Sequence, residues 1–202
     1  MKKIAIFGGT FNPFHNAHLE VLDAVSKSKL ADEILLMPTK LPPHKQCDFL
    51  ADETHRLKMC ALAAQHFDNV TACDMELKMQ GKSYTFNTVS ELKKSKSSEI
   101  LFVCGGDMIT TFNRWYRYEE LLQMMGIIAV RRKGIDNEEF NRAVEFLKAK
   151  GGKIFVLEIT PAEISSSEIR QMKFDDMKKH IPAFIAEYIS ENGLYGGEQD
   201  AK

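Results

Sequence analysis

The sequence of 202 residues lacks long apolar runs and any large excess of charge. No stretch approaches the roughly 18 consecutive apolar residues that indicate a membrane-spanning helix. The apolar run Ile4-Ala-Ile-Phe7, which follows the opening lysines, is too short for a secretory signal. The formal net charge is −1, which provides no overall positive field for binding nucleic acid. We therefore expect a cytoplasmic protein that binds neither a membrane nor nucleic acid.

Cysteines are few and are spaced singly. Cys47, Cys60, Cys73 and Cys104 form no C-x-x-C pair, so the sequence indicates neither a zinc ribbon nor a disulfide framework. We interpret all four as reduced structural thiols.

The two most familiar phosphate-binding fingerprints are also missing. No G-x-G-x-x-G follows a strand pattern, and no G-x-x-x-x-G-K-[ST] is present. These absences argue against a nicotinamide-dependent dehydrogenase and against a P-loop kinase.

Short apolar runs alternate with helical patterns along the whole chain. The expected strands are Ile4–Phe7, Glu33–Met37, Val70–Cys73, Ile100–Cys104, Ile127–Val130 and Ile154–Leu157. The expected helices are Leu19–Lys27, Glu53–Gln65, Phe86–Lys94, Tyr118–Met125, Glu138–Lys150, Ser167–Met172 and Ile181–Glu191. This alternation predicts an α/β fold with a doubly wound, mostly parallel sheet and helices on both faces. We expect one domain over residues 1–202.

Polar motifs follow five of the expected strands. In a parallel sheet the carboxyl ends of the strands lie at one edge, where such folds bind their ligands. The motifs are Gly8–His18, Pro38–Lys45, Gly105–Asp107, Arg131–Gly134 and Ser165–Arg170. We expect them to form a single site.

The first motif combines a Gly8-Gly9 turn with the start of a helix, for which Asn16 is the expected N-cap. His15 and His18 are three residues apart at that start and can face the same way. Free backbone N–H groups, the helix dipole and two imidazoles together favour an anion such as a phosphate chain. The same histidines could be half of a metal site, although no third ligand is evident.

The run from Gly8 to His18 resembles the signature of the nucleotidylyltransferase superfamily, Gly-Gly-x-Phe-Asp-x-x-His-x-Gly-His. Members of this superfamily transfer a nucleotidyl group from a nucleoside triphosphate and release pyrophosphate. Asn12 and Ala17 depart from the usual Asp and Gly. The resemblance implies catalytic roles for two residues and ATP contacts for a larger set. The catalytic residues are His15 and His18, and the ATP contacts are Gly8, Gly9, Thr10, Phe11, His15 and His18.

Two further motifs carry positive charge toward the same edge. Pro42-Pro-His-Lys45 places a lysine on a loop stiffened by prolines, and it matches bacterial nicotinate-mononucleotide adenylyltransferases. That resemblance implies a catalytic Lys45 near the triphosphate and the acceptor. Ser165 and Glu168 have capping-box spacing, and the run to Arg170 resembles the family's Ile-Ser-Ser-Thr-x-Ile-Arg. It implies ATP contacts from Ser165, Ser166 and a catalytic Arg170, with residues 163–195 completing the phosphate site.

The remaining motifs have both a structural and a functional interpretation. Gly105 and Asp107 offer close backbone approach and an acceptor for ribose hydroxyls, although Gly-Asp turns are common. Trp115, the sole tryptophan, and Tyr116 are either core aromatics or, by the resemblance, part of acceptor recognition. The resemblance also places Tyr84 and Thr85, the expected N-cap of the next helix, beside the acceptor. Arg132 is assigned there too, with a solvated basic turn as the alternative.

The resemblance as a whole implies adenylyl transfer from ATP to nicotinate mononucleotide, with Mg²⁺ bound to ATP and no metal-binding residues in the chain. Nicotinamide mononucleotide and, less readily, phosphopantetheine stay open as acceptors. A non-catalytic nucleotide-binding protein on the same fold is a further alternative, because Asn12 and Ala17 alter the signature. A homo-oligomer is compatible with the family.

Overall fold

The computed structural model describes residues 1–40, 50–81, 83–95, 97–132 and 137–196. Six strands form one sheet in the order β3-β2-β1-β4-β5-β6, and every adjacent pair is parallel. The strands are β1 (Lys3–Gly9), β2 (Glu33–Pro38), β3 (Val70–Ala72), β4 (Glu99–Gly105), β5 (Gly126–Arg132) and β6 (Ile154–Ile159). The predicted strands and the predicted doubly wound topology are both confirmed.

The helices that the sequence patterns predict are also present, with ends that differ by up to a few residues. They are α1 (Asn16–Ser28), α2 (Glu53–Ala64), α4 (Thr85–Ser95), α6 (Tyr118–Met124), α7 (Asn137–Ala149), α8 (Ser166–Ile169) and α10 (Ala183–Glu191). Short helices that were not expected are α3 (Met75–Lys78), α5 (Gly106–Thr110), α9 (Phe174–Met177) and the 3-10 turns η1 (Phe112–Arg114) and η2 (Leu194–Gly196).

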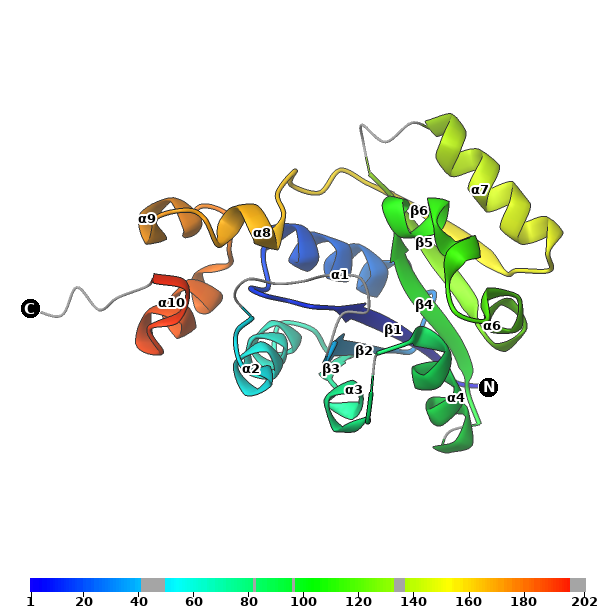
Figure 1. Cartoon of the computed structure of the whole chain (residues 1–202), viewed down its shortest axis with the longest axis horizontal. Coiled ribbons are helices and arrows are strands. Elements are labelled where there is room, and N and C mark those ends of the chain that lie inside the picture. Colours follow the sequence, from blue (N-terminus) through cyan, green and yellow to red (C-terminus); the bar gives the residue numbers. More distant parts are fainter. Residues whose placement is uncertain (41–49, 82, 96, 133–136, 197–202) are drawn as a thin grey trace, which may run out of the picture.

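The sheet has an apolar layer on each face, because successive side chains of a strand point to opposite sides. Ala5 and Phe7 of β1 face the layer formed by α1, α2 and the C-terminal helices. Ile4 and Ile6 face the layer formed by α4, α5, α6 and α7. Helices α8, α9 and α10 gather at one end of the molecule, and α6 and α7 lie at the other (Figure 1).

Helices α1 and α2 cover one face of the sheet, α4 to α7 cover the other, and the C-terminal helices return to the first face. From β1 the chain proceeds through α1, β2 and α2 to β3, and then returns through α4 to β4, which pairs with β1 on its other side. The strand order therefore reverses between β1 and β4. Folds of this kind bind ligands at the carboxyl ends of the strands beside such a reversal.

The described parts of the chain contain no helix that is long and apolar enough to cross a membrane.

Candidate active site

Helix α1 begins at Asn16, and its N-cap is His15 instead of the expected Asn16. The backbone N–H of His15 donates to Nδ1 of His18 at 3.3 Å. The imidazole of His18 thus has the role that Glu or Gln has in a capping box. With His15 as N-cap, the helix begins one residue earlier than it would with the expected N-cap, Asn16. The backbone N–H of Asn16 donates to the carbonyl oxygen of His180 at 3.0 Å, so the helix start is also joined to the C-terminal segment.

The two glycines before this turn have a different role from the one expected. Strand β1 continues through Gly9, and the left-handed residue of the turn is Phe11, with a φ of 48°. A Cβ on Gly9 would lie 2.9 Å from the ring of Phe11, whereas a Cβ on Gly8 would meet its nearest neighbour, the Phe102 ring, at 3.6 Å. Gly9 is therefore needed for a close approach of the Phe11 ring.

The structure brings the predicted histidine pair together. The rings of His15 and His18 are stacked, with centroids 3.6 Å apart and planes 25° from parallel. His15 is 3% exposed, and the rings of Phe11 and Phe14 lie 5.0 Å and 5.4 Å from that of His18. Because Nδ1 of His18 accepts a hydrogen bond, the neutral ring carries its proton on Nε2, where it is a donor. The arrangement fixes both the orientation and the tautomer of His18.

Asn12, one of the two altered letters of the signature, points into the protein and is fully buried. Its Oδ1 accepts from the Tyr195 hydroxyl at 2.5 Å and from the Ala51 backbone N–H at 3.1 Å. Burial raises the pKa of Tyr195, so the phenol is a donor at neutral pH. The other altered letter, Ala17, is 1% exposed within α1. Both departures thus lie in the packing around the turn.

The predicted capping box at the start of α8 is confirmed. Ser165 is the N-cap, and its Oγ accepts from the Glu168 backbone N–H at 3.2 Å. The Ser165 backbone N–H and Oγ donate to the Glu168 carboxylate at 2.8 and 2.6 Å. These hydrogen bonds lower the pKa of Glu168 and keep its carboxylate charged. The hydroxyl of Ser165 is therefore engaged by its own helix.

Helix α8 is docked on the histidine turn. Oγ of Ser166 donates to the carbonyl oxygen of Pro13 at 3.1 Å, and Nη1 of Arg170 donates to that of Asn12 at 2.8 Å. Nη2 of Arg170 is 3.3 Å from Oγ of Ser167. The structure therefore places two of the predicted ATP-binding residues of α8 directly against the turn that carries the histidines.

The end of β4 lies beside the end of β1. Ile6 pairs with Phe102, and three residues further along, the two strands end at Gly9 and Gly105. Asp107 follows in the first turn of α5 and is exposed, and a Cβ on Gly105 would lie 2.9 Å from its Oδ1. Gly105 and Asp107 thus stand at the predicted edge of the sheet.

The predicted acceptor-binding aromatics come from two separate segments that meet in the structure. The rings of Tyr84 and Tyr116 lie 5.1 Å apart, and Tyr116 is 52% exposed. Trp115 is half-buried, stacked on Phe112 at 4.7 Å and edge-on to Phe102 at 5.8 Å. Trp115 therefore belongs to the core packing and at the same time adjoins the exposed tyrosine.

Helix α4 begins at Thr85 itself, so Thr85 is the first helical residue and not the expected N-cap. The segment that contains Tyr84 and Thr85 is held by a buried acid, Glu76, which sequence reasoning missed. Glu76 is 5% exposed, accepts from Oγ1 of Thr88 at 2.7 Å, and has its pKa raised by burial. Oγ of Ser83 accepts from the backbone N–H of Lys40 at 3.2 Å. These contacts connect the segment to α3 and to the residues after β2.

Two predicted basic residues are not placed at the site by the structure. Lys45 lies outside the described residues, and for Arg132 only the backbone, at the end of β5, is described. The neighbouring Arg131 forms an ion pair with Glu158 at 3.2 Å and lies over the Phe140 ring at 5.3 Å. Arg131 is therefore a structural residue of the sheet and α7.

Arg56 of α2 is a further buried polar residue that sequence reasoning missed. Its side chain is 1% exposed and contacts the turn after β1. A signal was present, because Arg56 stands at i, with Met59, Cys60 and Ala63 at i+3, i+4 and i+7. An arginine in the apolar stripe of a helix indicates a buried guanidinium with internal acceptors.

Among the described residues, no three His, Cys, Asp or Glu side chains gather in a way that could hold a metal ion. Cys60 and Cys104 are free, buried thiols, as expected, and burial raises the pKa of both. Cys73 is half-buried directly after β3. Cys47 lies outside the described residues.

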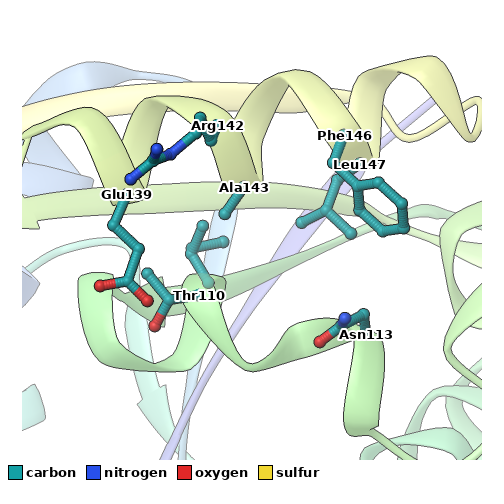
Figure 2. A pocket seen from close by; sticks show the side chains of 8 residues that line it. Thr110, Asn113, Glu139, Arg142, Ala143, Phe146 and Leu147 are labelled. Atoms are coloured by element: carbon teal, nitrogen blue, oxygen red, sulfur yellow. The ribbon is translucent and has the colours of Figure 1, made fainter.

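A cavity of about 250 Å³ lies between α7 and the segment of α5 and η1 (Figure 2). Its lining consists of Ile109, Thr110, Asn113, Glu139, Arg142, Ala143, Phe146 and Leu147. It shares no residue with the histidine turn or with α8, so it is separate from the candidate active site.

The fold and the turn together define a class of nucleotide-transferring proteins. The chain belongs to the cytidylyltransferase-like family, whose sequence profile matches residues 6–172. It is 37% identical to the nicotinate-nucleotide adenylyltransferase of Bacillus subtilis, over 96% of this chain and 99% of that protein. It is 39% identical to the probable nicotinate-nucleotide adenylyltransferase of Carboxydothermus hydrogenoformans, over 96% and 98% of the two chains.

A solved structure has the same fold. The Plasmodium falciparum nicotinic acid mononucleotide adenylyltransferase complexed with NaAD superposes with a TM-score of 0.80 at 24% identity. The match covers 99% of this chain and all of that chain.

Proposed function

We propose that this protein transfers the adenylyl group of ATP to the 5′-phosphate of nicotinate mononucleotide, forming the deamido dinucleotide and pyrophosphate. The observation that carries the proposal is the stacked pair of His15 and His18 at the N-terminus of α1, beside the ends of β1 and β4. The named activity of the Bacillus subtilis relative supports it.

The reaction requires positioning more than proton transfer. An oxygen of the mononucleotide phosphate attacks the α-phosphorus of ATP, and the bond from that phosphorus to the bridging oxygen of pyrophosphate breaks. Nucleophile and leaving group are both anionic at neutral pH, so no strong base is needed. We assign His18 to donate from Nε2 to a phosphate oxygen as charge builds up, with His15 stacked behind it.

The remaining ATP contacts follow from the elements around the turn. The N-terminus of α1, which begins at Asn16 after the turn that follows Gly8-Gly9-Thr10-Phe11, favours the negative charge of phosphate. Ser165, Ser166 and Arg170 of the 163–195 segment would complete the phosphate site, and Gly105 and Asp107 would adjoin the ribose. Arg170 and Lys45 would supply cationic contacts to the phosphates. Mg²⁺ would arrive with ATP, held by phosphate oxygens and water.

The acceptor would lie toward the aromatic segments. Trp115 and Tyr116 offer ring faces next to Tyr84, and Thr85 offers a hydroxyl and the N-terminus of α4. We assign these residues, together with Lys45 and Arg132, to the mononucleotide. We further propose that residues 1–202 form a single domain and that the protein acts in the cytoplasm. It would bind no nucleic acid, and a homo-oligomer is compatible with the proposal.

A pyrophosphate-release assay tests the function. The purified protein with ATP and Mg²⁺ is given nicotinate mononucleotide, nicotinamide mononucleotide or phosphopantetheine in parallel reactions. Fastest release with nicotinate mononucleotide is the expected result. Faster release with either other acceptor would reassign the substrate, and ATP binding without release in any reaction would favour the non-catalytic alternative.

A further inference from the structure

Arg56 has the largest fully buried side chain among the described residues and is 1% exposed. Within the described chain no carboxylate forms an ion pair with it. Burial lowers the pKa of its guanidinium, although the group stays charged because its ordinary pKa is far above neutral. A charge buried without an opposite charge is unfavourable, and a well-packed apolar side chain is commonly as stable or more stable in such a place. A contribution to folding stability is therefore a weak explanation for the presence of an arginine at position 56.

The guanidinium is held by carbonyl oxygens of three separate segments. Nε donates to Ala51 at 3.0 Å, and Nη1 donates to Thr10 at 3.0 Å and to Thr39 at 2.6 Å. These carbonyls belong to the residues before α2, the turn after β1 and the residues after β2. A guanidinium is planar and presents its donors in a fixed fork, so it sets the relative positions of the groups it binds.

Thr10 connects this fork to the histidines. It lies between Gly9 and Phe11, and the Phe11 ring packs edge-on against His18 at 5.0 Å. A displacement of the Thr10 carbonyl would move Phe11 and, with it, the ring of His18. None of these hydrogen bonds of Arg56 goes to a histidine, so the proposed influence on them passes through the turn.

We propose that Arg56 is a positioning residue that fixes the turn after β1 and thereby the Nε2 donor of His18. The proposal rests on the proposed function for its activity readout. It assigns Arg56 the role of a brace, distinct from the residues that touch substrate.

Two substitutions separate bracing from charge. Arg56→Lys keeps the positive charge and loses the planar fork, and Arg56→Met keeps similar volume and loses the charge. Lys58→Met is the matched control, because Lys58 is an exposed cation on the same helix. Bracing predicts that both Arg56 variants lower kcat on the order of 10²-fold, because small misplacements near the reaction centre have effects of that size. The control should retain the wild-type kcat.

A readout independent of turnover is the nitrogen chemical shifts of the His18 ring. They should change in both Arg56 variants and stay unchanged in Lys58→Met. This measurement stands even if the wild-type protein releases no pyrophosphate, a result that would count against the proposed function alone. Ethylguanidinium added to Arg56→Ala should restore kcat and the His18 shifts, whereas ethylammonium should not.

Three results would overturn the proposal. Arg56→Lys with wild-type kcat and unchanged His18 shifts would show that the charge alone matters and that the planar fork does not. Folded Arg56→Met with unchanged His18 shifts would show that the turn does not depend on Arg56. Failure of every Arg56 variant to fold, with or without ethylguanidinium, would show that the residue serves stability alone.

Discussion

Replacing Tyr195 with phenylalanine should lower stability by an amount that the contacts of Asn12 define. The substitution removes the hydroxyl that donates to Oδ1 of Asn12 at 2.5 Å and leaves the ring in place. A hydrogen bond between neutral groups contributes about 0.5–1.5 kcal/mol net to stability. Oδ1 keeps the Ala51 amide as a donor, so the expected loss is about 1 kcal/mol. For a chain of this length that corresponds to a fall in Tm of about 2–4 °C.

The difference between wild type and Tyr195→Phe should also depend on pH. Burial raises the pKa of Tyr195 above its ordinary value of about 10. Below pH 10 the phenol is protonated in both folded and unfolded chains, and its contribution is fully present. As pH rises above 10, the unfolded phenol ionises first, which favours unfolding of the wild type. The wild-type advantage should therefore shrink above pH 10.

Thermal unfolding followed by circular dichroism tests both parts. Tyr118→Phe is the control, because its hydroxyl donates to the exposed Glu119, and a change within about 0.5 kcal/mol is expected there. An unchanged Tm in Tyr195→Phe at pH 7, or a constant difference from wild type up to pH 11, would refute the reasoning.

Three further predictions concern single residues of the site and its support. His18→Ala should lower kcat for pyrophosphate release on the order of 10²-fold with an unchanged circular dichroism spectrum, and normal activity would reject its assignment. Gly9→Ala should lower stability in urea by about 1–3 kcal/mol, because its Cβ would meet the Phe11 ring at 2.9 Å. Gly8→Ala should lose less, and equal losses would contradict the steric argument. Glu76→Gln should gain urea resistance relative to wild type as pH rises from 4.5 to 7.5, because burial raises the wild-type carboxyl pKa and its ionisation disfavours the fold. Urea midpoints of wild type and Glu76→Gln that change in parallel with pH would contradict this explanation.

The sheet could be predicted because its strands are buried on both faces. Continuous apolar runs such as Ile4–Phe7 and Ile127–Val130 indicate strands of a parallel sheet, and the helical patterns between them indicate a doubly wound fold. The order of the strands in the sheet was not predicted. The short helices α3, α5 and α9 could not be predicted in the same way. They have about one turn each, which is too short for an apolar periodicity to appear.

Some contacts among the candidate site residues could be predicted from the sequence. The proximity of His15 to His18 and the capping box of α8 follow from residue spacing, and the proximity of Tyr84 to Tyr116 agrees with the shared role that the family resemblance implies. The N-cap at His15 depends on a hydrogen bond from its backbone to a side chain three residues later, which propensities do not include. The roles of all the site residues, Lys45 and Arg132 included, stay predictions.

Buried polar residues were the main omission, and the reason is physical. Arg56 and Glu76 look like surface residues, because charged side chains are almost never fully buried without partners. Their partners are backbone carbonyls and a hydroxyl, which the neighbouring sequence does not identify. The apolar stripe around Arg56 indicates that this residue is buried, but it does not indicate which groups the guanidinium binds.

The docking of α8 on the histidine turn has a consequence for the order of folding. Ser166 and Arg170 contact residues that precede them by 153 and 158 positions, and Lys179 accepts from Asn16 across 163 positions. Contacts at such separations close very long loops and form late in folding. During synthesis the histidine turn leaves the ribosome near the beginning, and it acquires these contacts only after about 180 residues have been made. The growing chain should therefore pass through a stage with a formed sheet and an incomplete phosphate site, in which release of ATP analogues is fast.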